Sequence, residues 1–332
     1  MSTTPPSTPA AASLGQQFPY RLQKANPLLC EWLTNTADTF TEPFFDQTLT
    51  RLRAAPVNQQ PFKGAAHVDL LPEWAARGGP GRAPTAIIFH VSRCGSTLFS
   101  QLLALQPQHL VLSEVPFFDE LLRLPLSCPA VTPAAAGRLF HAALQLYAGS
   151  APHIPEHVFV KADSWHLHFY EQLRQLYPTV PFVLLYRNPW EVLQSQQRRR
   201  SVQAVPGMLE PALFGFGPEQ AAEYDLDRHM ANVLHSYLKK MLTVVGSDPH
   251  SILLNYSEGA EAGLRKIVAA TGIPFPDHYA RQVAERAGFH AKYPGQAFQE
   301  ADNQEESPAF LAPTMALYNQ LEALRQRAAL AE

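Results

Sequence analysis

The sequence predicts an α/β fold of three layers, in which helices flank both faces of a central parallel sheet. From residue 86 onward, short apolar runs alternate with stretches of helical periodicity. The runs AIIFHV and PFVLLY lack the polar alternation of a half-exposed strand, and such runs are typical of parallel strands that are covered on both faces. Composition agrees, because 46% of the 332 residues are hydrophobic and 17% are charged, as in globular proteins with a large core.

The chain divides into four predicted segments. Residues 1–14 are rich in Ser, Thr, Pro and Ala, which predicts a disordered tail. Residues 15–85 are predicted to be a helical extension packed on the core. Residues 86–300 carry the alternating pattern and form the predicted α/β domain, and residues 301–332 add a loop and a C-terminal helix.

The predicted extension contains two helices, over 26–37 and 42–53. In the second, Pro43 suits the first turn of a helix. Four apolar residues fall on one face of it at helical spacing and are predicted to pack inward: Phe44, Phe45, Leu49 and Leu52. A loop rich in Gly, Pro and Ala, over 75–84, then leads into the first core strand.

The elements of the α/β domain are predicted from the alternation between short apolar runs and stretches of helical periodicity. Strands are expected at 86–91, 110–112, 158–161, 181–186 and 251–256. Helices are expected at 96–105, 117–123, 134–147, 165–176, 189–199, 219–245, 261–271 and 313–330. Pro189 fits the first turn of the helix that follows the fourth strand. The predicted result is a parallel sheet with a helix in most of its crossovers.

Charge and cysteine content limit the class of function. The formal charge of −3 argues against a nucleic-acid partner, although a local basic cluster remains compatible with it. Three widely separated cysteines favour reduced thiols and a cytoplasmic protein over a disulfide scaffold or a zinc site. The start MSTTPPSTPAAASLG lacks the apolar core of a signal peptide, and no run of about 18 apolar residues predicts a membrane span.

Charged side chains end four of the predicted strands. Arg93, Glu114, Lys161 and Arg187 each follow or close a different apolar run. The carboxyl ends of parallel strands meet at one rim of the sheet, where ligands of such folds bind. Residues that lie far apart in sequence are therefore expected to converge on one site.

The stretch FHVSRCGSTLFSQLL predicts a strand, a glycine turn and a helix of the P-loop type. Gly95 permits a tight turn, after which the backbone N–H groups of Gly95, Ser96 and Thr97 can hold an anion at the helix N-terminus. The lysine of the ATP-binding form GxxxxGK[ST] is absent, and Arg93 precedes the glycine instead. An ordinary strand–turn–helix is the alternative interpretation of this stretch.

A second candidate anion site follows the fourth strand, in YRNPWEVLQSQ. Arg187 is a bidentate donor to anions, and the start of the next helix offers free N–H groups. Two separate sites are what a ligand with two phosphate ends requires.

These motifs together resemble the sulfotransferase superfamily, whose members take a sulfuryl group from 3′-phosphoadenosine 5′-phosphosulfate (PAPS). The pattern is most similar to the tyrosylprotein-sulfotransferase-like branch, which reads roughly PRSGTTL, then Glu, then KDP, then RD with Ser eight residues on. This chain has SRCGSTL, LSE, VKAD and YRNP…QS in the same order between residues 86 and 201. A weaker similarity continues in LLNYSEG…LRKIVAATGIPF. Cys94 and Asn188 depart from the Ser and Asp of that pattern.

The resemblance implies a PAPS-dependent sulfotransferase that moves a sulfuryl group in line onto an acceptor hydroxyl. Arg93 and Lys161 would stabilise the transferring group, and Glu114 would act as general base. The cofactor-binding set that it implies is Arg93, Cys94, Gly95, Ser96, Thr97, Arg187, Ser195 and Tyr256. In this set, Arg187 and Ser195 would hold the 3′-phosphate. No metal is expected, because a sulfuryl group carries less charge than a phosphoryl group.

Several alternatives stay open at this stage. Asp163 is either the base or the cap of the helix near residue 165. Glu114, when considered without the other motifs, is also compatible with a charge at a helix N-terminus or on the surface. The whole pattern is also compatible with a nucleotide or small-molecule kinase, or with a non-catalytic nucleotide-binding protein of this fold. The acceptor is expected to be a small hydroxyl compound, and the oligomeric state is open.

Other features carry weaker interpretations. The run 198–200 is either a solvated basic face or a guide for an anionic cofactor. The apolar loop over 205–217 is either a lid or a packed loop. Lys292 is a further candidate nucleotide contact, by analogy with late family segments. The histidine pairs near residues 153–157 and 166–168 lack the spacing of a metal site.

Overall fold

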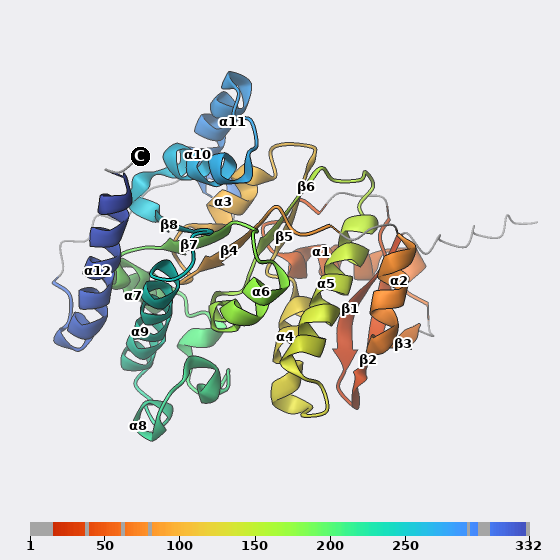
Figure 1. Ribbon diagram of the computed structural model, residues 1–332, viewed down its shortest axis with the longest axis horizontal. Coiled ribbons are helices and arrows are strands. Elements are labelled where there is room, and N and C mark those ends of the chain that lie inside the picture. Colours follow the sequence, from red (N-terminus) through yellow and green to blue (C-terminus); the bar gives the residue numbers. More distant parts are fainter. Residues whose placement is uncertain are drawn as a thin grey trace, which may run out of the picture.

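Five parallel strands form the central sheet of the protein (Figure 1). The computed structural model describes residues 16–36, 40–60, 64–78, 82–290, 293–297 and 306–329; the predicted tail and Lys292 lie outside them. The strands are β4 (Ala86–His90), β5 (His109–Ser113), β6 (His157–Lys161), β7 (Phe182–Tyr186) and β8 (Ser251–Asn255), in the spatial order β5-β6-β4-β7-β8. Every residue of β4, β5 and β7 is buried, which explains the absence of polar alternation in their sequences.

Helices cover both faces of this sheet, so the predicted three-layer α/β fold is confirmed. Figure 1 shows α3 (Ser96–Leu103), α10 (Ala260–Thr271) and α11 (Asp277–Ala287) along one face. The other face carries α5 (Pro133–Gly149), α6 (Tyr170–Leu176) and α9 (Leu226–Val245). The remaining long helices are α4 (Pro116–Ser127), α7 (Pro189–Arg198) and α12 (Ala312–Ala329).

The predicted helix over 26–37 is wrong, because this segment forms a strand. An antiparallel sheet is made by β1 (Gln17–Gln23), β2 (Asn26–Thr34) and β3 (Ala65–His67). In the hairpin, Cys30 lies opposite Leu22 and Leu33 lies opposite Phe18. A short apolar run fits both helical and strand periods, and here the pairing with a second strand decides the outcome. The extension is therefore not purely helical.

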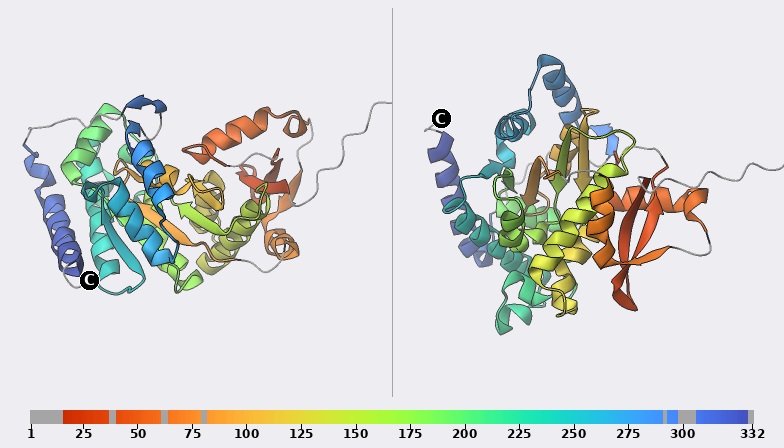
Figure 2. Two further views of the ribbon diagram at one scale, coloured as in Figure 1. Left: turned by 90° about the horizontal axis from the view of Figure 1, so that it is seen from above. Right: turned by 45° about the vertical axis from the view of Figure 1, so that its right-hand side comes forward.

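The second predicted helix of the extension is present as α1 (Phe45–Ala54). Aromatic side chains join the extension to the core: the rings of Phe18 and Phe45 lie 4.7 and 5.2 Å from that of Tyr147 on α5. The Tyr147 hydroxyl also donates to the carbonyl oxygen of Pro19, at 2.7 Å. The right-hand view of Figure 2 shows this small sheet beside α4 and α5. This packing brings the start of α1 to the rim of the central sheet.

The predicted helix over 219–245 is interrupted. A short helix, α8 (Pro218–Ala221), precedes α9, whose N-cap Asp225 accepts the N–H groups of Asp227 and Arg228. After α11, the chain forms a hairpin of β9 (Phe289–His290) and β10 (Tyr293–Ala297). Within the described part of the chain, none of the helices combines the length and hydrophobicity that crossing a bilayer requires.

Candidate active site

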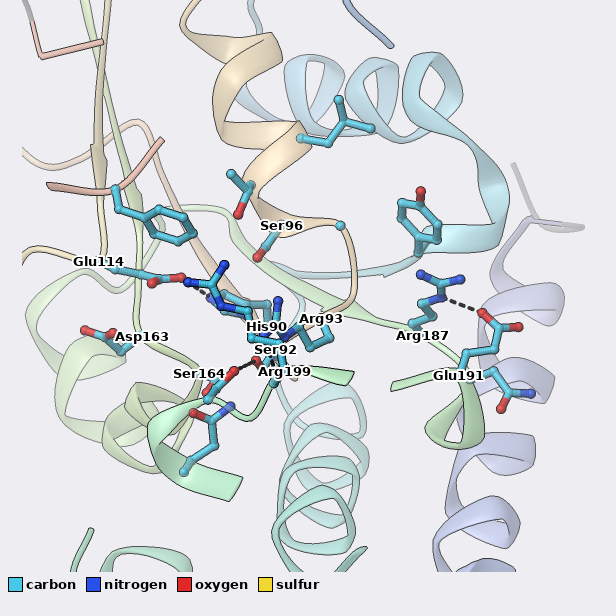
Figure 3. Close-up of a pocket in the computed structure, with 18 of the residues that line it drawn as sticks. His90, Ser92, Arg93, Ser96, Glu114, Asp163, Ser164, Arg187, Glu191 and Arg199 are labelled. Atoms are coloured by element: carbon cyan, nitrogen blue, oxygen red, sulfur yellow. Dashed lines mark hydrogen bonds and ion pairs between the residues drawn. The ribbon is translucent and has the colours of Figure 1, made fainter. Parts of the chain in front are cut away.

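A cavity of about 1120 Å³ opens at the carboxyl ends of the central strands. Seven of the ten residues predicted for catalysis or cofactor binding line it: Arg93, Gly95, Ser96, Thr97, Glu114, Arg187 and Tyr256. In Figure 3, Glu114 and Asp163 lie on one side of this space, Arg187 and Glu191 lie on the other, and Arg93 lies between them. Lys161, Cys94 and Ser195 do not belong to its wall.

The loop between β4 and α3 has an unusual backbone. Ser92, Arg93 and Gly95 all adopt positive φ angles, of 64°, 50° and 81°. Non-glycine residues take this conformation at a cost, and such residues cluster at functional sites. At Gly95 there is a second constraint, because a Cβ atom would lie 2.3 Å from ring carbons of Tyr256. Glycine is therefore required there, and α3 begins at once, with its first residues Ser96 and Thr97 in the cavity wall.

Arg93 is held by the chain that follows α7. Its Nη2 donates a hydrogen bond to the carbonyl oxygen of Arg199, which also lines the cavity. Nearby, the side-chain Nε2 of Gln196 donates to the Ser92 hydroxyl at 3.3 Å, and the backbone N–H of Ser201 donates to the side-chain Oε1 of Gln196 at 2.9 Å. The loop and the end of α7 thus form one hydrogen-bonded wall.

Glu114 and Lys161 form an ion pair at the opposite side. Lys161 ends β6 with its side chain completely buried, and its Nζ contacts Glu114 Oε1. Burial alone would raise the pKa of Glu114, but the Lys161 ammonium and His90 outweigh it and hold that pKa well below its usual range. Glu114 also has a positive φ, of 52°, and it lines the cavity, whereas Lys161 does not. The carboxylate is therefore ionised at neutral pH.

His90, which the sequence interpretation missed, completes this cluster. Its Nδ1 accepts the N–H of Ser92 at 3.0 Å, so in the neutral ring the proton is on Nε2. That nitrogen lies 2.9 Å from the carbonyl oxygen of Ala162 and 3.4 Å from Glu114 Oε1. Burial lowers the pKa of His90, so the ring is neutral, and its single N–H points to the nearer acceptor, the carbonyl oxygen of Ala162, with Glu114 close by.

Asp163 lies in the cavity wall beside Glu114 and begins the short helix η4 (Ser164–Phe169) as its N-cap. The predicted capping position is thus present, although this leaves its chemical role open. Burial, then the charges of Glu114 and Asp119, raise the pKa of Asp163 well above its usual range. Two neighbouring carboxyl groups consequently have pKa values that are shifted in opposite directions.

The predicted second anion site is partly assembled. Arg187 follows β7, its Nε pairs with Glu191 on α7, and its guanidinium lies 4.6 Å from the centre of the Tyr256 ring. Asn188 caps α7 by accepting the N–H of Trp190 at 2.9 Å. Ser195 lies on α7 away from the cavity wall, so its predicted phosphate contact stays a prediction.

Cys94 contributes only its backbone to the loop. Its side chain is completely buried, and the thiol donates to the carbonyl oxygen of Leu185 at 3.6 Å. Burial raises the pKa of this thiol to about 11, so it is neither a nucleophile nor an anion donor.

Further residues of the wall had no recognisable signal in the sequence. They come from α1, from η4, and from the segment around η5 (Val202–Ala204), which folding alone brings together. These residues are Phe44, Asp46, Gln47, Ser164, Trp165 and Gln203. Arg199 and Arg200, which belong to the basic run 198–200 that the sequence singled out, line the cavity as well. The loop over 205–217, by contrast, contributes no residue to the cavity wall; Leu209, Leu213 and Phe214 are buried, so it is a packed loop.

One group of described residues has the composition of a metal site. Ligand atoms of Asp119, Asp163 and His166 all lie within 4.8 Å of one another. However, Asp119 already accepts from Trp165 Nε1 at 2.6 Å, from His166 Nε2 at 3.0 Å and from Arg123 at 2.9 Å. These donors occupy three of about four lone-pair sites of its carboxylate, and His166 Nδ1 accepts the N–H of Asp163 at 3.2 Å, so the group forms a hydrogen-bond network.

Three sulfotransferases are among the solved structures with a similar backbone. One is a sulfotransferase domain from the curacin biosynthetic pathway, with 15% identity, a TM-score of 0.46, and coverage of 73% of this chain and 99% of that one. A sulfotransferase from Alicyclobacillus acidocaldarius has 17% identity and a TM-score of 0.41, with coverage of 74% of this chain and 96% of that one. Sulfotransferase STF9 from Mycobacterium avium has 13% identity and a TM-score of 0.44, with coverage of 80% of this chain and 79% of that one. No family model and no curated protein sequence matches the chain. Support for a function therefore comes from the residues of the cavity.

Proposed function

We propose that this protein is a sulfotransferase that moves a sulfuryl group from PAPS onto an acceptor hydroxyl. The observation that carries the proposal is the shared cavity: the loop arginine Arg93, the rim arginine Arg187 and the carboxylate Glu114 all line it. Arg187 lies away from Glu114, with Arg93 between them. Such a cavity can take a nucleotide with an anion at each end and an acceptor at the carboxylate side.

The residues present fit PAPS. The N–H groups at the start of α3, together with Arg93, would hold the 5′-phosphosulfate. Arg187, stacked on Tyr256, would hold the 3′-phosphate at the other end. When bound, PAPS supplies a sulfuryl group on a good leaving phosphate. A lysine after the loop glycine, which a P-loop kinase needs, is replaced by Ser96, and this disfavours the kinase alternative.

Side chains of the protein then supply the base and the charge stabilisation that an in-line transfer needs. Glu114 takes the hydroxyl proton as the acceptor oxygen bonds to sulfur and the bond from sulfur to the bridging phosphate oxygen breaks. Arg93 offsets the charge that develops on that bridging oxygen. The products are a sulfate ester, adenosine 3′,5′-bisphosphate and a protonated Glu114. No metal is required by this scheme.

Lys161 links the two halves of the reaction. While it pairs with Glu114, the low pKa of that carboxylate makes it a weak base. If the ammonium turns toward the departing phosphate oxygen, it stabilises the leaving group and the pKa of Glu114 rises at the same time. Asp163 is the alternative base, because its pKa is raised and it lines the same cavity.

Thermal unfolding with added nucleotides tests the proposal. Adenosine 3′,5′-bisphosphate at 100 times its Kd should raise the Tm by roughly 5 °C, whereas ATP with Mg²⁺ should not. Arg187→Ala should remove the shift, and Arg265→Ala, which changes an exposed arginine paired with Glu261, should keep it. A shift with ATP and Mg²⁺ alone would support the kinase instead. Binding without release of bisphosphate from PAPS across a screen of hydroxyl acceptors would indicate a non-catalytic protein.

A further inference from the structure

The two ends of the cavity carry opposite charge. Among the cations of the wall, Arg187 lies at the nucleotide end, Arg93 and Arg199 lie between the two ends, and Arg200 also belongs to the wall. At the acceptor end the wall contains the carboxylates of Asp46, Glu114 and Asp163. Asp46 belongs to this end because it interacts electrostatically with both Glu114 and Asp163. The nucleotide end therefore favours an anion, and the acceptor end favours a cation.

The carboxylates of the acceptor end are not fully balanced by protein cations. Lys161 pairs with Glu114. Among the described residues no cation forms a salt bridge with Asp46, and the recorded salt-bridge partner of Asp163 is His166 Nε2 at 3.7 Å, which instead donates to Asp119. Burial of Asp163 and partial desolvation of Asp46, which is an exposed residue, raise the pKa values of both, and repulsion by the charge of Glu114 raises them further. A bound cation would relieve this repulsion.

Aromatic side chains line the same end. Phe44, at the start of α1, already has the Lys161 ammonium 5.0 Å from its ring centre. Trp165, from η4, is fixed by a hydrogen bond of 2.6 Å from its Nε1 to Asp119. Ring faces beside carboxylates are the surroundings that proteins use to bind ammonium groups.

A buried donor in this cavity points independently to a ligand. Gln203, on η5, is 2% exposed and belongs to the wall, and its Nε2 has no hydrogen-bond partner among the described residues. A buried N–H without a partner is unfavourable, by about 1–3 kcal/mol in general, so an acceptor atom of a ligand would satisfy it. A hydroxyl or sulfuryl oxygen has the required lone pairs, which an ammonium group lacks.

We propose that the acceptor is a small hydroxyl compound that also carries a protonated amine. The ammonium lies between Asp46, Asp163 and the Phe44 and Trp165 rings, while the hydroxyl is presented to Glu114. This inference rests on the proposed function for the transfer itself. The charge preference of the acceptor end is a separate property, which binding can measure without turnover.

Calorimetric titration of acceptors that differ only in charge tests it. Tyramine, 4-ethylphenol and 3-(4-hydroxyphenyl)propanoate share one phenol, and 6-aminohexan-1-ol with hexan-1-ol gives an aliphatic pair. The full-length protein is titrated with and without adenosine 3′,5′-bisphosphate. We expect the amine in at least one series to bind about tenfold more tightly than its neutral partner. Asp46→Asn should remove most of this preference, and Asp69→Asn, with a side chain that is 81% exposed and outside the cavity, should retain it.

The outcomes separate the two proposals. Equal binding of charged and neutral members, absence of binding by both amines, or a preference unchanged in Asp46→Asn would each overturn the inference. Failure of the bisphosphate to bind, with the amine preference intact, would instead overturn the proposed sulfotransferase activity.

Discussion

The ammonium of Lys161 contacts the carboxylate of Glu114, and the lysine side chain has no exposed surface. This contact joins the end of β6 to the turn that follows β5 and places a buried charge directly behind a carboxylate of the cavity. Lys161 is therefore the structural partner of the candidate base, and in the proposed reaction it would also stabilise the leaving group.

Removal of the carboxylate should destabilise the fold. Glu114→Gln leaves the Lys161 ammonium buried without its counter-charge, so we expect the free energy of unfolding to fall by on the order of 3 kcal/mol. Urea denaturation at pH 7 measures this value. Glu261→Gln, which breaks an exposed pair with Arg265, is the control and should cost less than about 0.5 kcal/mol. Equal decreases in the free energy of unfolding of both variants would show that the buried pair contributes no more to stability than an exposed pair.

The pH dependence of turnover should identify the base. Since Lys161 and His90 hold the pKa of Glu114 well below its usual range, Glu114 is ionised throughout pH 5–8. With Glu114 as base, kcat/KM should therefore stay level as the pH falls to 5. With Asp163 as base, activity should rise with pH through its raised pKa, and Asp163→Asn should lose that rise. An acid limb that is present in the native protein and absent in Asp163→Asn would reject Glu114.

Stability should fall as the pH rises because of Glu120. This half-buried residue of α4 accepts the N–H of Leu22 at 2.5 Å, and burial raises its pKa from 4.5 to about 7. Between these two values the folded state binds a proton that the unfolded state has released, so the free energy of unfolding decreases by on the order of 3 kcal/mol. Glu120→Gln should lack this decrease. Parallel stability curves for both proteins from pH 4.5 to 7 would contradict the assignment.

Gly95→Ala should be more damaging than Gly207→Ala. Both glycines have left-handed backbones, with φ of 81° and 79°, so each substitution should cost about 1–2 kcal/mol of backbone strain. At Gly95 the new methyl group would also meet the Tyr256 ring at 2.3 Å, whereas at Gly207 nothing lies within 4 Å. Overpacking should add about 1–3 kcal/mol at Gly95 alone. Chemical denaturation of the two variants measures the difference, which Tyr256→Ala should reduce; equal losses would argue against a rigid contact.

The sequence predicted the central sheet well because its evidence is local. Uninterrupted apolar runs such as PFVLLY belong to buried parallel strands, and glycine at position 95 marks the turn into α3. The direction of parallel strands then places Arg93, Glu114 and Arg187 at one rim without any knowledge of side-chain contacts.

The same evidence failed where the partner of a segment was distant. Residues 26–34 became a strand because β1 pairs with them, and local periodicity did not distinguish this from a helix. The sequence identified Glu114 and Asp163 on the acceptor side of the cavity, but it missed other residues there for a related reason. Asp46 and Gln203 have ordinary sequence surroundings and reach the cavity only through the packing of α1 and η5.

Local composition and spacing thus determined which strands form and which charged residues stand at their ends. Tertiary structure decided what those charges do, because burial and neighbours set their protonation. It buried Lys161 behind Glu114, turned the Cys94 thiol into the core and raised the pKa of Asp163 beside a carboxylate whose pKa is lowered. These effects depend on distances of a few ångströms between residues far apart in the chain, and sequence spacing does not encode such distances.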